Sequence, residues 1–191
     1  MSAREQILEA VTRANANRNR TALPAFSYTA IQYTDLVAQF TEVLERIGAA
    51  VTVVDSLLVV KQWLQALPIG KTSVYIQPNL MYSFDTAYLY QVDVAAMHGT
   101  IAVAENGAIW LPESNMGNRM LPFSTQQLVL IIAQQDIVHN MQEAYQYIDT
   151  SAQGYGVFIA GPSKTADIEQ SLVIGAHGPI AMQVFIIKQV L

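Results

Sequence analysis

The most informative part of the sequence is Gly161-Pro162-Ser163-Lys164-Thr165-Ala166-Asp167-Ile168-Glu169, which follows the apolar segment 157–160. A second short block, Gly175-Ala176-His177-Gly178-Pro179, leads into another apolar segment at 182–187. Both apolar segments are short and bounded by glycine and proline, which is typical of buried strands. The two blocks therefore place hydroxyls, carboxylates, a cation and an imidazole between two predicted strands. Such crowding indicates a functional site more than a simple connection.

Working outward, apolar periodicity alternates between helical and extended spacing along the chain. Expected helices cover 2–17, 34–47, 56–67, 136–148 and 164–172, and expected strands cover 50–54, 74–76, 100–104, 108–111, 128–132, 157–160 and 182–187. Alternation of this kind predicts an α/β fold with a mixed, mostly parallel sheet and helices on both faces. The Asn106-Gly107 dipeptide predicts a tight turn, and hence at least one antiparallel pair of strands.

Composition excludes several classes of protein. The 191-residue chain has no cysteine, which removes disulfides, iron–sulfur ligands and cysteine-bound zinc. Residues 1–20 hold four arginines, and the rest of the chain has six basic and thirteen acidic side chains. The surface is therefore expected to repel nucleic acid. A polar start predicts no secretory signal, and the longest apolar runs are far shorter than the roughly 18 residues of a membrane span.

Charged residues make up only 13% of the chain, about half the usual share. We therefore expect part of the surface to be covered by a partner or by another copy, as in a homo-oligomer.

The block 161–169 has two interpretations that its spacing does not separate. In the first, Ser163 or Thr165 caps the helix expected at 164–172. Asp167 and Glu169 then stabilise the amino end of that helix through its dipole. In the second, free amides, the two hydroxyls and Lys164 form a pocket for a carboxylate or phosphate.

Nucleotide motifs are absent from this region of the sequence. A P-loop requires lysine directly after the second glycine, and here that position is Pro162. Gly154-Tyr155-Gly156 precedes a strand, whereas a dinucleotide fingerprint follows one.

The histidines His98, His139 and His177 show no metal-ligand spacing, so no metal site is expected. His139 is expected to be a satisfied or surface side chain, and His98 a turn residue. Glycines flank His177 closely, which allows another group to approach it, and Asp167 or Glu169 would orient its ring.

The turn Glu105-Asn106-Gly107 is the last candidate site. A hairpin tip usually faces water, which would make Glu105 an ordinary solvated acid. If the hairpin instead starts inside the sheet, a carboxylate at the end of a buried strand would have a raised pKa and would serve as base or nucleophile.

Taken together, these blocks resemble the LUD-domain family, the lactate-utilisation protein C group. The block 161–169 is similar to the signature of that family, and 175–179 is similar to its closing Gly-x-His-Gly-Pro. The segment 104–109 resembles a third block, although Asn106 and Ala108 stand where the family has threonine. Where many members carry a histidine near Leu121-Pro122, this chain has glutamines.

The absence of repeats and linkers predicts one LUD-like domain over 1–191, with 1–33 as an N-terminal helix and arm, and the resemblance covers roughly residues 95–188. The resemblance implies a fold like that of the sugar-phosphate isomerases and coenzyme A transferases. It also implies a cytoplasmic role in oxidising L-lactate to pyruvate beside iron–sulfur partner proteins. Any electron transfer would then use those partners or a cofactor that the sequence does not identify.

The candidate site follows from the motifs and the resemblance together. Glu105, Asp167 and His177 are the candidate catalytic residues. The candidate ligand-binding residues, for a small carboxylate or phosphate, are Asn106, Gly107, Gly161, Ser163, Lys164, Thr165, Glu169 and Gly178. Glu105 is also the nucleophile of the alternative function, that of a coenzyme A transferase, and a scaffold without a ligand is the remaining alternative.

Overall fold

A computed structural model of the chain describes residues 2–16, 31–149, 154–166, 172–174 and 178–188. The helices are α1 (Ala3–Asn15), α2 (Leu36–Arg46), α3 (Leu57–Gln65), α4 (Thr86–Leu89), α5 (Leu121–Ser124) and α6 (Met141–Tyr147), with 3-10 turns η1 (Glu113–Asn115) and η2 (Gln134–Asp136). The strands are β1 (Ala50–Val54), β2 (Ser73–Tyr75), β3 (Val94–His98), β4 (Ile101–Val103), β5 (Ile109–Pro112), β6 (Gln127–Ala133), β7 (Ile137–Val138), β8 (Gly156–Ile159), β9 (Lys164–Ala166), β10 (Leu172–Ile174) and β11 (Ala181–Ile187).

The largest sheet has five parallel strands in the order β1-β11-β6-β3-β2. A second sheet, in the order β7-β4-β5-β8, contains the antiparallel hairpin of β4 and β5. The α/β class and the mostly parallel sheet expected from the sequence are confirmed. The hairpin, however, lies in the second sheet instead of joining the parallel one.

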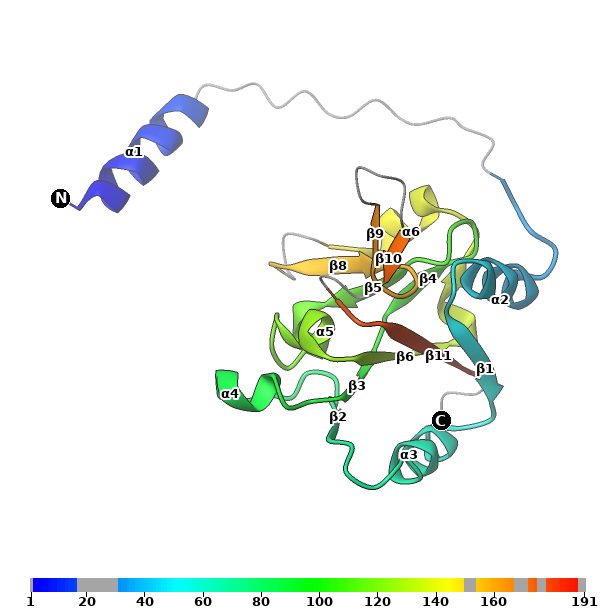
Figure 1. Ribbon diagram of the computed structural model, residues 1–191. Coiled ribbons are helices and arrows are strands. Elements are labelled where there is room, and N and C mark those ends of the chain that lie inside the picture. Colours follow the sequence, from blue (N-terminus) through cyan, green and yellow to red (C-terminus); the bar gives the residue numbers. More distant parts are fainter. Residues whose placement is uncertain (1, 17–30, 150–153, 167–171, 175–177, 189–191) are drawn as a thin grey trace.

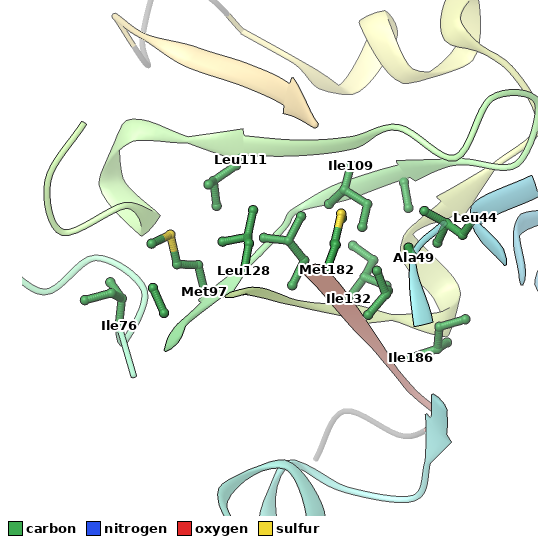
Figure 2. Packing of buried hydrophobic residues seen from close by; sticks show 14 of the residues in the cluster. Leu44, Ala49, Ile76, Met97, Ile109, Leu111, Leu128, Ile132, Met182 and Ile186 are labelled. Carbon is green, nitrogen blue, oxygen red and sulfur yellow. The ribbon is translucent and has the colours of Figure 1, made fainter. Parts of the chain in front are cut away.

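The main core fills the space between the two sheets. Buried side chains from β3, β6 and β11 point toward Ile109 and Leu111 of β5, as Figure 2 shows. Phe40 and Leu44 of α2 complete this core. Because side chains alternate along a strand, Val129, Ile131 and Phe185 point to the opposite face of the parallel sheet. There they pack in a second cluster that includes Val60 of α3.

The fold is therefore layered: α3, the parallel sheet, the core with α2, the second sheet and α6 (Figure 1). Ala144 of α6 packs with Val103 and Val138 on the outer face of the second sheet. Helix α1 stands apart from these layers in Figure 1, and all of its residues are exposed.

The chain passes from one sheet to the other through the short link between β3 and β4. The Gly99 N–H donates to the Ile131 carbonyl in the first sheet, and the next N–H, of Thr100, donates to the Trp110 carbonyl in the second. A Cβ at Gly99 would lie 2.3 Å from Cγ2 of Ile109. Only glycine therefore fits this crossing without moving the core.

The helix expected at 164–172 is wrong. Residues Lys164–Ala166 form β9, which pairs antiparallel with β10, Leu172–Ile174. The hydroxyl and acid pattern satisfies the rules for a helix start, but pairing with β10, which contains the β-branched Val173 and Ile174, prevails. Within the described residues Ser163 and Thr165 therefore cap no helix, and those residues offer no helix terminus to an anion.

Candidate functional site

The loop after β8 turns over the carboxyl end of α2. Gly161 has a φ of +73°, in the left-handed region that favours glycine. A Cβ at this position would lie 3.0 Å from Cγ1 and 3.1 Å from the carbonyl oxygen of Ile47. The glycine thus allows the turn to rest directly on the residue that ends α2.

The two polar blocks of the sequence meet at this loop. The Ser163 N–H donates to the Pro179 carbonyl at 2.9 Å. A Cβ at Gly178 would lie 3.1 Å from Cβ of Ser163, so the two chain segments are in close contact there. Blocks that are separate in sequence therefore form one wall.

A cavity of about 290 Å³ lies against that wall. Its polar lining includes the half-buried Ser163 and the exposed Lys164. Its lining residues are Pro122, Phe123, Leu128, Val157, Phe158, Ile159, Ala160, Gly161, Pro162, Ser163, Lys164, Gly178 and Pro179. A hydroxyl and an ammonium group over an apolar floor can bind a small anion, such as a carboxylate.

The predicted hairpin turn at 105–107 is confirmed as a turn. Asn106 Oδ1 accepts a hydrogen bond from the Ala108 N–H at 3.0 Å, and Gly107 has a φ of +74°. The Glu105 side chain is exposed, not buried at the end of the strand, and its Oε2 accepts a bond from the Met141 N–H at 3.2 Å. Glu105 thus sits at the start of α6 and faces water.

Helix α2 supports both of these motifs. A Cβ at Gly107 would lie 3.3 Å from side-chain atoms of Val43 and Leu44, while Gly161 contacts Ile47. Strands β5 and β8 pair antiparallel through Ile109 and Ile159, so the hairpin turn and the loop after β8 lie at the same end of the second sheet. Glu105, however, does not line the cavity of about 290 Å³.

Three of the candidate residues, Asp167, Glu169 and His177, lie outside the described residues. Thr165 is described only as part of the backbone of β9. The catalytic roles assigned to Asp167 and His177 therefore remain predictions.

The other two histidines are held by neighbouring side chains and backbone. Nδ1 of His139 accepts a hydrogen bond from the Tyr33 N–H at 2.9 Å, as expected for a satisfied side chain. His98 ends β3 instead of forming a turn, and its Nε2 lies 2.7 Å from the Tyr75 hydroxyl. Among the residues that the structure describes, no group of three or more metal-ligating side chains is arranged around a common point.

A second, larger cavity of about 660 Å³ lies beside the first, and no motif of the sequence indicated it. Phe123 and Gly178 line both cavities. Arg119 lines the larger one, and its Nε and Nη2 donate to the two carboxylate oxygens of Glu113 at 2.6 and 2.7 Å. These bonds lower the pKa of the Glu113 carboxyl below its usual range.

Two further side chains shape the larger cavity. The Arg119 guanidinium lies over the Tyr155 ring, 4.9 Å from its centroid. The Ser124 Oγ is buried and has no hydrogen-bond partner among the described residues. Glu113 belongs to η1 and Ser124 to α5, and Arg119 lies in the short segment between these two turns.

A third cavity, of about 240 Å³, shares Gln126 and Ile180 with the larger one. Asp93, Gln127 and Ala181 beside it adjoin or begin strands β3, β6 and β11. These three cavities are therefore grouped at the amino ends of the parallel strands.

No described helix is both long and apolar enough to cross a membrane.

Comparison with known proteins identifies the family of the chain. The family model of the LUD domain matches residues 84–187, just over half of the chain. This region contains the hairpin turn, the loop after β8 and all of β11.

Curated relatives agree with this match. The chain is 36% identical to a lactate utilization protein C from a Geobacillus species over 99 residues, which are 49% of this chain and 41% of that protein. It is 29% identical to the protein of the same name from Geobacillus thermodenitrificans over 119 residues, 59% of this chain and 50% of that one. The chain thus spans half or less of the length of these relatives in the matched regions.

A solved structure supports the fold. The crystal structure of a DUF162 family protein from Deinococcus radiodurans is similar with a TM-score of 0.62, at 17% identity, over 83% of this chain and 99% of that one. The fold is therefore a known one. Because the family model covers more than half of its length, the chain belongs to the LUD-domain family.

Proposed function

We propose that this chain takes part in lactate utilisation by binding a small carboxylate in the cavity of about 290 Å³. The observation that carries the proposal is the meeting of the two polar blocks at Ser163 and Gly178, with Lys164 on the same wall. Lys164 supplies the positive charge, and Ser163 supplies a hydroxyl donor. The match to proteins named lactate utilization protein C supports lactate or pyruvate as the acid.

The oxidation of L-lactate to pyruvate releases two electrons, which this chain is not equipped to hold on an iron–sulfur cluster because it has no cysteine. We therefore propose that iron–sulfur partner proteins accept the electrons in a cytoplasmic assembly. In that assembly this chain binds and orients the acid.

Isothermal titration calorimetry with L-lactate, pyruvate and acetate tests the proposal. Lys164→Gln and Ser163→Ala should each weaken binding, Lys164→Gln by at least about tenfold, since a charge-assisted hydrogen bond contributes about 1.5–3 kcal/mol. Lys188→Gln is the matched control, because Lys188 forms an exposed ion pair with Asp55 at 2.9 Å. If none of the acids binds, with or without candidate partner proteins, the proposal is wrong.

A second candidate is a coenzyme A transferase, favoured by the position of the hairpin turn. Glu105 is exposed at the same end of the second sheet as the loop after β8, and is therefore accessible to an acyl donor. A Glu105 oxygen would attack the thioester carbonyl, forming a mixed anhydride and releasing the coenzyme A thiolate. Mass spectrometry after incubation with acetyl-coenzyme A should then show an adduct that is absent in Glu105→Ala. An unmodified protein would leave carboxylate binding, or a scaffold role, as the function.

A further inference from the structure

The larger cavity is a candidate binding site that the carboxylate proposal does not use. Its volume of about 660 Å³ is more than twice that of the neighbouring cavity. Sites for ligands of many atoms typically occupy about 300–1,000 Å³, whereas lactate has only six heavy atoms. The cavity therefore fits a larger molecule than the proposed acid.

Arg119 lines this cavity, is held by Glu113, and has further N–H donors. Glu113 accepts hydrogen bonds from Nε and Nη2, and the guanidinium lies over the Tyr155 ring, 4.9 Å from its centroid. A guanidinium carries five N–H groups, and the hydrogen bonds of the described residues account for only two of them on Arg119. A fixed arginine with free N–H groups is well suited to bind a phosphate or carboxylate.

Aromatic rings form the other part of the lining. Tyr155 is half-buried, while Phe123 and Tyr90 are exposed, and all three line the cavity. Rings of this kind stack on flat heteroaromatic groups, with a contribution of about 1–3 kcal/mol for a nucleobase.

The residue Ser124 also lines this cavity, although its hydroxyl is buried. The Ser124 Oγ lacks a hydrogen-bond partner within the described part of the chain. A buried hydroxyl without a partner destabilises the protein.

We propose that this cavity binds a phosphorylated, planar heteroaromatic molecule, that is, a nucleotide or a nucleotide-derived cofactor. The ring packs among Tyr90, Phe123 and Tyr155, and the phosphate accepts hydrogen bonds from Arg119. Because Phe123 and Gly178 line both cavities, the ligand lies beside the site proposed for the small acid. The proposal does not depend on what that smaller cavity holds.

Calorimetry on the full chain tests the proposal with three probes: AMP, flavin mononucleotide and coenzyme A. At least one should bind, and this identifies the source of the ring. Adenosine and ribose 5-phosphate each carry only one half of AMP, and riboflavin lacks the phosphate of flavin mononucleotide. Each half should bind at least about tenfold more weakly than the complete probe.

Variants locate the site. Arg119→Gln and Tyr155→Leu should each weaken binding of the nucleotide by at least about tenfold and leave the binding of L-lactate unchanged. Lys164→Gln should do the reverse, so failure of one proposal is distinguishable from failure of the other. Arg46→Gln is the control, because Arg46 is an exposed arginine whose nearest acid, Glu42, lies 3.9 Å away.

The proposal is overturned if no probe binds, or if binding is unchanged in Arg119→Gln and Tyr155→Leu. If ribose 5-phosphate binds as tightly as AMP, the cavity is an anion site only, and the proposal also fails. Should Arg119→Gln not fold, Arg119→Lys keeps the charge but loses the two-point contact with Glu113. It should still reduce nucleotide binding.

Discussion

His98 shows at the scale of a residue how burial sets a proton equilibrium. His98 is half-buried, and its Nε2 lies 2.7 Å from the Tyr75 hydroxyl. Burial, together with the positive charge of Lys61, lowers the pKa of His98 from 6.5 to about 4. The ring is therefore neutral at physiological pH.

Stability should consequently fall as the pH is lowered. Between pH 6.5 and about 4 the unfolded chain binds a proton at His98 that the folded protein does not. The free energy of unfolding should decrease over this window, by at most roughly 3 kcal/mol from this group. Urea denaturation at a series of pH values measures the decrease.

The control for this prediction is His98→Gln, which cannot take up the proton. The variant should show a smaller decrease than the unaltered protein between pH 6.5 and 4. Equal decreases in both proteins would assign the pH dependence to carboxylates such as Asp93, whose pKa is lowered by hydrogen bonds from the Thr72 N–H and Lys71.

At the scale of elements, β5 and β8 depend on a glycine beside a large ring. Gly156 pairs with Pro112, and a Cβ at Gly156 would lie 2.2 Å from Cζ2 of Trp110. Gly156→Ala should therefore force the Trp110 ring to move, at a cost of about 1–3 kcal/mol in the free energy of unfolding. Chemical denaturation of the variant measures this cost.

A double-mutant cycle with Trp110→Phe supplies the control. Phenylalanine lacks the outer indole ring, so Gly156→Ala should cost less in that background. An equal cost in both backgrounds would place the strain in the backbone instead of the ring contact.

The sequence predicted those elements whose signals are local. Asp35 caps α2 through a bond from the Ala38 N–H at 2.9 Å, Gly48 ends that region with a φ of +92°, and the turn at 105–107 joins β4 to β5 as expected. Strand β3 was missed because its Ala95 and Ala96 carry little β preference, although both are fully buried.

Elements that depend on distant partners were placed less well. The helix expected from 136 begins only at Met141, after η2 and β7. Strand β7 exists because it pairs with β4. Asn140, whose Oδ1 accepts the Glu143 N–H at 3.0 Å, is the local signal that marks the true start of α6.

The candidate site likewise has a part that the sequence predicted and a part that it did not. Glycine and proline blocks identified the loop after β8 and the segment at 178–179. The larger cavity could not be predicted, because it requires Arg119, Ser124 and Tyr155 to meet through the packing of separate elements.

At the scale of the whole molecule, the folded core begins after α1. Every residue of α1 is exposed, including Ile7, Leu8 and Val11, and the LUD domain match begins only at residue 84. Removing residues 2–16 should therefore shift the thermal midpoint by less than about 2 °C, as for surface changes in a protein of this size. Circular dichroism during heating measures the midpoint.

A fall of several degrees would contradict this prediction, and would show that α1 packs against a surface, for example that of a second copy. Sedimentation velocity of the full chain and of the chain without residues 2–16 shows whether α1 packs against a second copy, since loss of an oligomer changes the sedimentation coefficient.

Helix α2 has one more consequence for experiments on this protein. Leu44 and Ile47, about one helical turn apart, contact the hairpin turn and the loop after β8 respectively. Displacement of either turn is thus transmitted through a common support to the other. Substitutions in these two segments should show epistasis, and the effect of a double variant will not equal the sum of its parts.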